Sequence, residues 1–258
     1  MAKNTSTERA AIRVARNIVQ DIQDRALRPG TPLDPEYVMV EKLGVARATV
    51  REALRFLELQ GALRIKAGPG GGPVVNVPHT DHLVSAISLQ LQFANASFQA
   101  VIDARMSIYP VLAGEAAKTA THQHIQAIQH SIACMRAAVN DSDSLTHEAR
   151  QFHNLVADAS GNMVLGFLVK ALHKMSEGTG IHYDLRQRKA SVEKAGRVLL
   201  AIEAGDAENA RKVTEDMLAA ALRYWKKNAP DLLDSPVSWL ADLPRGNPLL
   251  PELQAARL

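Results

Sequence analysis

LGVARATVREALRFLELQGAL, residues 43–63, predicts a tight turn at Gly44, an amphipathic helix, and a stop at Gly61. Three apolar residues of this helix face inward: Val50, Leu54 and Leu57. Three arginines recur at every fourth position: Arg47, Arg51 and Arg55. Since residues four apart lie on the same side of a helix, these arginines project together.

The segments on both sides of this helix complete a recognisable order. Residues 8–27 have apolar residues at helical spacing, and residues 35–43 read as a short helix that Asp34 is placed to cap. After Gly61, residues 62–77 contain two short β-capable runs around a Gly/Pro-rich turn. Helix, helix, turn, helix and hairpin is the order of a winged helix-turn-helix.

The charge is distributed unevenly along the chain. Residues 1–78 contain 12 Lys/Arg and 8 Asp/Glu, a balance of +4, whereas residues 79–258 contain 18 and 19. All of the excess positive charge therefore lies in the first third, as expected of a small nucleic-acid-binding module attached to a neutral partner domain.

Candidate DNA contacts follow from the helix and the hairpin. Guanidinium groups match guanine edges and phosphate oxygens, so Arg47 and Arg51 are candidates for bases or phosphates, and Arg55 for a phosphate. Thr49 is a candidate for a phosphate or a thymine methyl group. The hairpin tip adds three candidates: Lys66, Gly68 and Gly70. The plainer alternative is a solvated basic stripe, partly neutralised by Glu52 and Glu58; the turn, the wing and the charge asymmetry together favour DNA.

Residues 79–228 read as almost continuous helix. The segments are 81–94, 97–119, 122–140, 144–159, 162–178, 186–204 and 206–227, with Asp206 as a cap for the last. No strand intervenes, so the fold is mainly α: an N-terminal winged helix-turn-helix, residues 1–78, and a C-terminal all-α bundle of six to seven helices, residues 79–228. The Pro-rich tail, residues 229–258, is either loosely ordered or lies against another surface, such as a second subunit.

Composition excludes several classes of protein. Only 4% of the residues are aromatic, which argues against a base-stacking platform for single-stranded nucleic acid. The single cysteine, Cys134, allows no internal disulfide, and no segment resembles a signal peptide or a membrane span, so we expect a cytoplasmic protein. Neither a nucleophile–base pair nor a carboxylate dyad supports an enzyme.

These residues resemble a known family. LGVARATVREALRFLELQGAL is similar to the signature of GntR-superfamily regulators, and DAR, FHNLVADASGN and AIEAGDAENARK resemble the FadR-like, or FCD, subfamily. The resemblance covers residues 8 to about 227 and implies a dimer that binds a palindromic operator and releases it when a small organic acid or related metabolite enters the helical bundle. Ala46 and Tyr37 depart from the family pattern, which implies a different operator sequence.

The effector domain departs much further from the pattern. Many relatives hold a divalent metal through an Asp-x-x-x-His pair and two later histidines, and His153 matches only the first of these histidines. The other three ligand positions hold Ala149, Ala195 and Met217. One imidazole alone does not hold zinc, so we expect no metal and no cofactor, and His153 is either a polar cavity residue or a hydrogen-bonded core residue.

Loss of the metal changes the expected ligand. The resemblance implies an effector site that also includes Arg105 and Tyr109; Arg105 either binds a carboxylate or phosphate or forms a salt bridge. A larger, more apolar cavity favours a bulkier effector, such as an acyl-CoA, an aromatic acid or a steroid-like acid. We therefore expect a homodimeric, ligand-responsive transcription regulator, most simply a repressor. The alternative is a constitutive DNA-binding protein whose helical domain serves only dimerisation.

Overall fold

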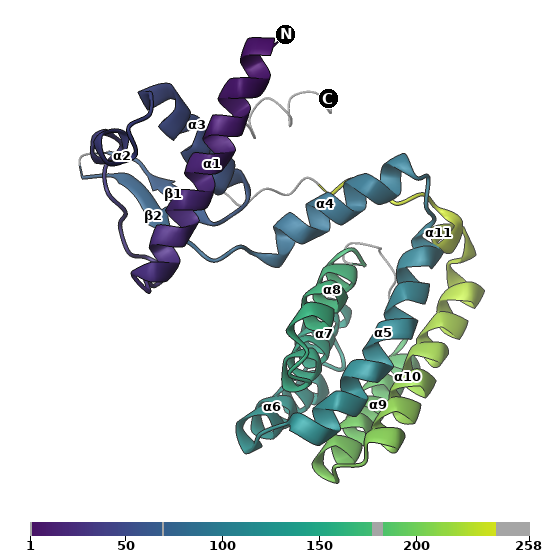
Figure 1. The fold of residues 1–258 in the computed structure, drawn as a ribbon. Helices are drawn as coiled ribbons and strands as arrows, with labels where there is room; N and C mark the ends of the chain where they lie inside the picture. The colour runs from purple at the N-terminus through teal and green to yellow at the C-terminus, as the bar shows by residue number, and fades with distance from the viewer. Residues whose placement is uncertain (1, 69, 177–182, 241–258) are drawn as a thin grey trace. The chain divides into compact units, whose positions relative to one another are not determined.

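The computed structural model describes residues 2–68, 70–176 and 183–240. The chain divides into two compact units, Met1–His82 and Leu83–Leu258, and the boundary expected after residue 78 lies close to this division. The predicted fold class is confirmed: the first unit is a winged helix-turn-helix and the second is all-helical (Figure 1).

The N-terminal unit has the expected order of elements. It consists of α1 (Ala2–Asp24), α2 (Glu36–Leu43), α3 (Arg47–Leu59), β1 (Leu63–Lys66) and β2 (Gly72–Val75). The strands pair antiparallel, from Leu63 with Val75 to Lys66 with Gly72. The core forms where α1 packs on α3, and its apolar residues include Val14, Ile18, Val50, Leu54 and Leu57.

Gly44 forms the turn between α2 and α3, and the start of α2 differs from the prediction. Gly44 adopts φ 61°, a left-handed conformation, and its N–H bonds to the Val40 carbonyl. At the other end of α2, the cap residue is Pro35, which forms no side-chain cap bond. The prediction that Asp34 caps this helix is therefore wrong: its carboxylate accepts a hydrogen bond from Lys42 Nζ at 2.7 Å instead.

The C-terminal unit is built from helices in the part of the chain that the structure describes. They are α4 (Thr80–Phe93), α5 (Phe98–Thr119), α6 (His122–Ala137), α7 (Ser142–Ala159), α8 (Met163–Lys174), α9 (Leu185–Glu203), α10 (Ala207–Asn228) and the short α11 (Pro230–Asp234). Asp206 caps α10 as predicted, accepting from the Asn209 N–H. The predicted break at residues 178–180 lies outside the described residues.

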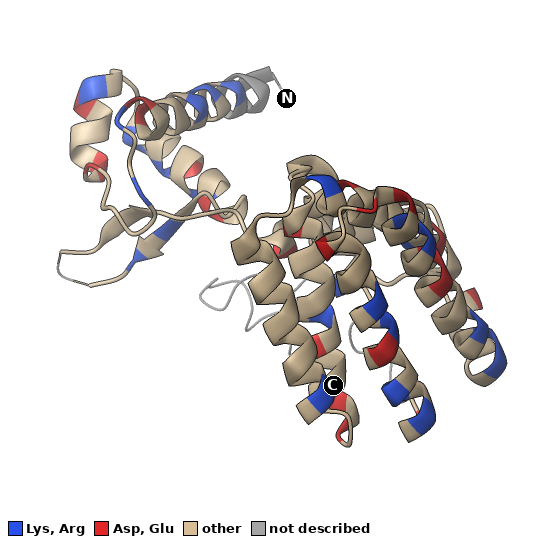
Figure 2. Ribbon diagram, turned by 90° about the horizontal axis from the view of Figure 1, so that it is seen from below, with Lys and Arg blue, Asp and Glu red and all other residues tan. Residues whose placement is uncertain are grey.

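Helix α5 is the central element of this unit. It packs along α10 and also contacts α7, α8 and α9, while α6 packs on α7 (Figure 1). The largest core cluster lies among these helices and includes Leu112, Ile128, Phe152, Val156 and Val198. In Figure 2, basic and acidic residues are interspersed over the helices of this unit, which agrees with its nearly neutral charge balance.

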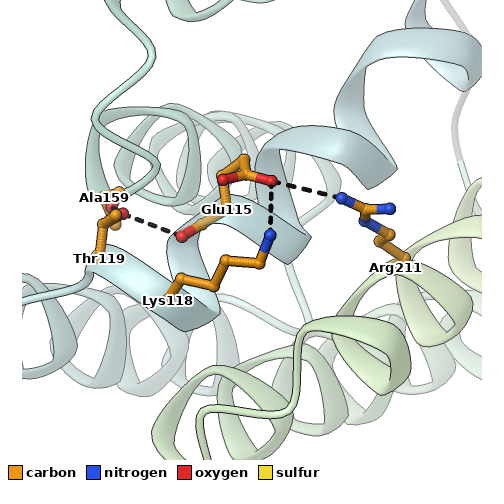
Figure 3. Close-up of polar contacts among 5 residues, drawn as sticks. All are labelled: Glu115, Lys118, Thr119, Ala159 and Arg211. Carbon is orange, nitrogen blue, oxygen red and sulfur yellow. Dashed lines mark hydrogen bonds and ion pairs between the residues drawn. The ribbon is translucent and has the colours of Figure 1, made fainter.

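Polar contacts join α5 to its neighbours at the end near Thr119 (Figure 3). The Glu115 carboxylate accepts hydrogen bonds from Lys118 at 3.0 Å and from Arg211 of α10 at 3.3 Å. Thr119 Oγ1 lies 2.9 Å from the Glu115 carbonyl and 2.8 Å from the Ala159 carbonyl at the end of α7. Gly114 permits close packing on α10, because a Cβ there would lie 2.5 Å from Arg211 Nε.

Residues 235–240 fold back onto α4. The Trp239 backbone N–H donates to Gln92 Oε1 at 2.6 Å, and its indole N–H donates to Ser85 Oγ at 3.0 Å. The Leu240 N–H donates to Ser88 Oγ at 3.0 Å. Of the two alternatives for the tail, this part therefore lies against a surface, and that surface belongs to its own chain; residues 241–258 lie outside the described residues.

Candidate functional site

The exposed side of α3 carries the three arginines that the sequence singled out. Arg47, Arg51 and Arg55 are all exposed, whereas the other side of the helix is buried in the core of the N-terminal unit. The helix is therefore amphipathic in the sense the spacing predicted, and its guanidinium groups are accessible to a ligand.

Glu36 of α2 connects two of these arginines, a contact that sequence spacing did not reveal. Its carboxylate accepts from Arg51 Nε at 2.9 Å and from Arg47 Nε at 3.3 Å. Burial raises the pKa of Glu36, but the hydrogen bonds from Arg51 and Arg47 outweigh it, so the pKa lies below its usual value. The group is thus charged at neutral pH, and it orients both guanidinium groups while leaving them more than half exposed.

The hairpin presents the other predicted contacts at its tip. Lys66, Gly68 and Gly70 are exposed, and Gly68 and Gly70 have positive φ angles of 92° and 72°. A Cβ at Gly71 would lie 2.2 Å from the Lys66 carbonyl oxygen, so the turn requires glycine at this position. A tip of small residues beside a lysine allows the backbone to approach a phosphate closely.

The prediction for Thr49 needs correction. Its side chain lies on the buried side of α3, and only 7% of the residue is exposed. Position 49 is two residues from Arg47 and Arg51, about half a turn around the helix, so it faces the core rather than the arginine side. We therefore leave Thr49 out of the candidate contact surface.

In the C-terminal unit, two adjoining hollows form one central cavity. They share six lining residues: Arg105, Ala149, His153, Tyr183, Ser191 and Trp225. Counting the parts that open to solvent, the overlapping hollows enclose about 780 and 830 Å³. Five predicted effector residues line this cavity: Arg105, Ala149, His153, Ala195 and Met217.

Arg105 is the main cation of the cavity. Its Nη1 donates to Ser176 Oγ at 3.0 Å, and its Nε is buried without a hydrogen-bond partner. Burial lowers the pKa of Arg105 to about 10, although the nearby Tyr183 and Tyr109 oppose this shift. The guanidinium therefore remains charged at neutral pH. Arg105 forms no ion pair with an Asp or Glu among the described residues. These residues therefore give no support to the alternative that Arg105 forms a salt bridge.

Three polar rings pack together behind Arg105. The ring centroids of His153 and His173 lie 4.9 Å apart, and Tyr109 contacts both at 4.9 and 5.4 Å. Burial, followed by the positive charge of Arg105, lowers the pKa of His153 to about 3. Burial, Arg105 and His153, in that order, lower the pKa of His173 well below its usual value. Both imidazoles are therefore neutral at pH 7, and His173 has no hydrogen-bond partner at either nitrogen.

Tyr109 does not lie where it was expected. It is fully buried, contacts the two histidine rings from behind, and is not part of the cavity lining. Burial raises the pKa of its hydroxyl well above the usual value, which Arg105 only partly opposes, so the group is neutral. Tyr109 thus supports the histidines, and its prediction as a direct effector contact is corrected.

The cavity residues do not fit a divalent metal. Ala149, Ala195 and Met217 line the cavity together with His153, and none of the three offers a metal-binding oxygen or nitrogen. Across residues 2–68, 70–176 and 183–240, no three His, Cys, Asp or Glu side chains are grouped to hold a metal ion. The positive charge of the Arg105 guanidinium also repels a further cation.

Several cavity residues were missed in the sequence. His173 lies in the last turn of α8, Ser176 comes just after this helix, and Arg188 lies on α9. Tyr183 and Trp225 meet through a 2.6 Å hydrogen bond from the indole to the phenol. The resemblance to the family pointed mainly to the metal-ligand positions, and none of the missed residues occupies such a position. The sequence signal that could have indicated this part of the cavity was His173, a polar residue within the apolar face of α8.

Comparison with known proteins supports the two-part organisation. Residues 10–72 match the model of bacterial regulatory proteins of the gntR family, and residues 100–220 match the FCD domain. A putative L-lactate dehydrogenase operon regulatory protein of Escherichia coli K12 is 30% identical over 205 residues, covering 74% of this chain and 76% of the relative. A fatty acid metabolism regulator protein of Escherichia fergusonii is 27% identical over 166 residues, or 64% of this chain and 69% of the relative.

A solved structure shows the same fold. Streptococcus agalactiae GntR aligns over 83% of this chain and 99% of its own, with a TM-score of 0.66 and 20% sequence identity. A separate observation concerns membranes: none of the helices within the described residues combines the length and the apolar character needed to span a bilayer.

Proposed function

The chain belongs to the gntR family of bacterial regulatory proteins and carries an FCD domain, and on this premise we propose that it is a ligand-responsive repressor. In this proposal a homodimer binds a palindromic operator through α3 and the hairpin. A small organic acid or acyl-CoA-like effector enters the central cavity and releases the DNA. The cavity binds the effector and does not transform it.

The observation that supports ligand response is the charge state of the cavity. A guanidinium removed from water is costly unless an anion or hydrogen bonds compensate it. Among the residues that the structure describes, Arg105 has one hydrogen bond, to Ser176, and its buried Nε has no partner. A carboxylate ligand would accept from the Nε–H and the neighbouring Nη2–H at once, which is the fork geometry that arginine favours.

The DNA contact is supported by the accessible guanidinium groups of α3. Arg47 and Arg51 each have more than half of their side-chain surface exposed, with Glu36 holding them in place. We assign base-edge or phosphate contacts to these two residues and phosphate contacts to Arg55, Lys66 and the backbone of Gly68 and Gly70.

A DNA-binding experiment tests the proposal. Fluorescence anisotropy with the DNA upstream of the protein's own gene is expected to show specific binding that a candidate acid reverses. Arg51→Ala should weaken binding about tenfold or more, since a good bidentate contact contributes roughly 1–3 kcal/mol of discrimination. Arg16→Ala, at an exposed position of α1, removes the same charge and serves as the control.

The alternative is constitutive DNA binding, with a helical unit that only dimerises. It is favoured by the alanines and methionine at three former ligand positions, Ala149, Ala195 and Met217. Specific binding that no acid, thioester or hydroxy acid reverses would establish this alternative. Absence of specific binding to the upstream DNA would instead contradict both.

A further inference from the structure

The central cavity has an apolar lobe and a polar lobe, and Arg105 lies where they join. The apolar lobe is lined mainly by hydrophobic side chains, including Ile102, Met106, Met135, Phe152, Met217 and Leu218. The polar lobe is lined by His153, His173, Ser176 and Arg188, among others. Arg105 lines both lobes. A ligand that contacts Arg105 can therefore place an apolar body in one direction and polar atoms in the other.

The charged groups of the cavity point to an anion. The lining that the structure describes contains Arg105, Arg150, Arg188 and Lys194 but no Asp or Glu. Arg150 is bonded to His147, and Arg188 lies close enough to Asp141 to lower the pKa of that carboxyl, after the larger effects of Ser144. Burial lowers the pKa of Lys194, and Asp216 and Glu193 oppose this shift. Among the described residues, Arg105 thus lacks a nearby carboxylate of the kind that Arg188 and Lys194 have.

His173 is a second group built for a ligand. It is only 5% exposed, lines the polar lobe, and has no partner at Nδ1 or Nε2 among the described residues. A neutral imidazole has one N–H donor and one acceptor nitrogen, and leaving both unsatisfied in the interior is costly. A carboxylate at Arg105 would supply an acceptor for this donor, so one ligand group would satisfy two buried side chains.

We propose, building on the ligand response proposed above, that the effector is a free monocarboxylate with an apolar body. Its carboxylate is bound by Arg105 and His173 without a metal, and its body lies in the apolar lobe between Met135 and Met217. A coenzyme A thioester fits less well: its acyl end carries a neutral carbonyl, so with the acyl chain in the apolar lobe the Arg105 charge would stay unpaired. A small hydroxy acid would leave the apolar lobe unfilled.

Calorimetric titration of the full chain with matched ligands tests the head group. Octanoate is expected to bind, whereas 1-octanol, octanoyl-CoA and L-lactate are not, because each lacks either the carboxylate or the apolar body. Arg105→Met should weaken octanoate binding about tenfold to a hundredfold, the range of a lost charge-assisted hydrogen bond. Arg136→Met, on the exposed side of α6, should leave it unchanged.

A pair of opposite variants tests where the apolar body lies. Ala195 and Met217 are buried residues that line the apolar lobe. Ala195→Leu fills the lobe and should move the preference towards shorter acids, whereas Met217→Ala enlarges it and should move the preference towards longer ones. Each methylene that finds room should change the affinity about fourfold. Circular dichroism checks that each variant is folded. If one variant does not fold, the other alone still tests the position of the apolar body.

The outcomes separate this inference from the proposed function. Binding of octanoyl-CoA, octanol or lactate in preference to octanoate, or unchanged octanoate binding in Arg105→Met, would overturn the monocarboxylate while leaving a ligand-responsive repressor. Failure of all four ligands to bind would also overturn it. Conversely, octanoate that binds through Arg105 but leaves DNA affinity unchanged would support the monocarboxylate and contradict the effector role.

Discussion

Burial determines the protonation state of individual residues in and around the central cavity. His153 and His173 are neutral because they are buried beside Arg105, whose cation disfavours a second positive charge. Tyr109 stays protonated because it is buried as well. Around Arg105 the cavity therefore combines a guanidinium with neutral donors and acceptors, an arrangement suited to a single carboxylate.

The histidines make the stability of the C-terminal unit depend on pH. The pKa of His153 is about 3 in the folded chain against 6.5 for the ordinary group. Between these values the unfolded chain binds more protons, so the free energy of unfolding falls as the pH drops from 6.5 towards 3. We expect His153→Phe to show a shallower fall between pH 6.5 and 5 than the unsubstituted protein.

Urea unfolding followed by tryptophan fluorescence measures this effect. Both tryptophans, Trp225 and Trp239, lie in the C-terminal unit, so the signal reports that unit alone. His147→Phe, at an exposed position on the same helix, serves as the control and should leave the slope unchanged. Equal slopes in His153→Phe and the unsubstituted protein would mean that His153 titrates normally in the folded state.

At the scale of elements, α2 and α3 act together through Glu36. The short helix brings a carboxylate to the two arginines at the start of α3, with distances of 2.9 and 3.3 Å. This contact restrains long side chains that would otherwise lose rotamer freedom on meeting DNA. It also places a negative charge where phosphates would bind, which disfavours unspecific association.

Glu36→Gln should therefore raise affinity for DNA and lower discrimination. We expect several-fold tighter binding to unrelated DNA and a smaller ratio between upstream and unrelated sequences, since the arginines lose their restraint and a repulsive charge disappears. Anisotropy titrations at one fixed salt concentration measure both affinities. Glu41→Gln makes the same change at an exposed position of α2, and an equal effect there would show that only net charge matters.

At the scale of the whole molecule, each unit has its own hydrophobic core. The core of the N-terminal unit lies around α1 and α3, and those of the C-terminal unit lie around α5. Leu54, for example, belongs to the core of the N-terminal unit. Separate cores are the physical basis for separate unfolding transitions.

A substitution in one core should accordingly affect one transition. Leu54→Ala, at a site 3% exposed, should destabilise the N-terminal unit by about 2–5 kcal/mol. Differential scanning calorimetry is expected to show a lower midpoint temperature for the transition of the N-terminal unit. The thermal midpoint from tryptophan fluorescence, which reports the C-terminal unit, should stay the same. A shift of the tryptophan signal by the same amount would show that the two units unfold cooperatively.

Local patterns in the sequence determined the elements. Four-residue spacing predicted the arginine side of α3, Gly44 predicted the turn before it, and Asp206 predicted the start of α10. These features follow from interactions within a few residues, which is why a single sequence is enough to read them. The resemblance to the family pattern, with alanine at positions 149 and 195, likewise implied a cavity without a metal set.

Only the tertiary structure decided which side chains meet. His173 joins His153 from a different helix, Glu36 reaches Arg47 and Arg51 across the turn, and Asp34 binds Lys42 instead of capping α2. Thr49 and Tyr109 have residue types that suit a contact surface, but their helices turn them inwards. Whether a polar side chain is exposed, paired or left without a partner depends on elements far away in the chain. That dependence leaves Arg105 as a half-buried cation, and it is the physical origin of the proposed site.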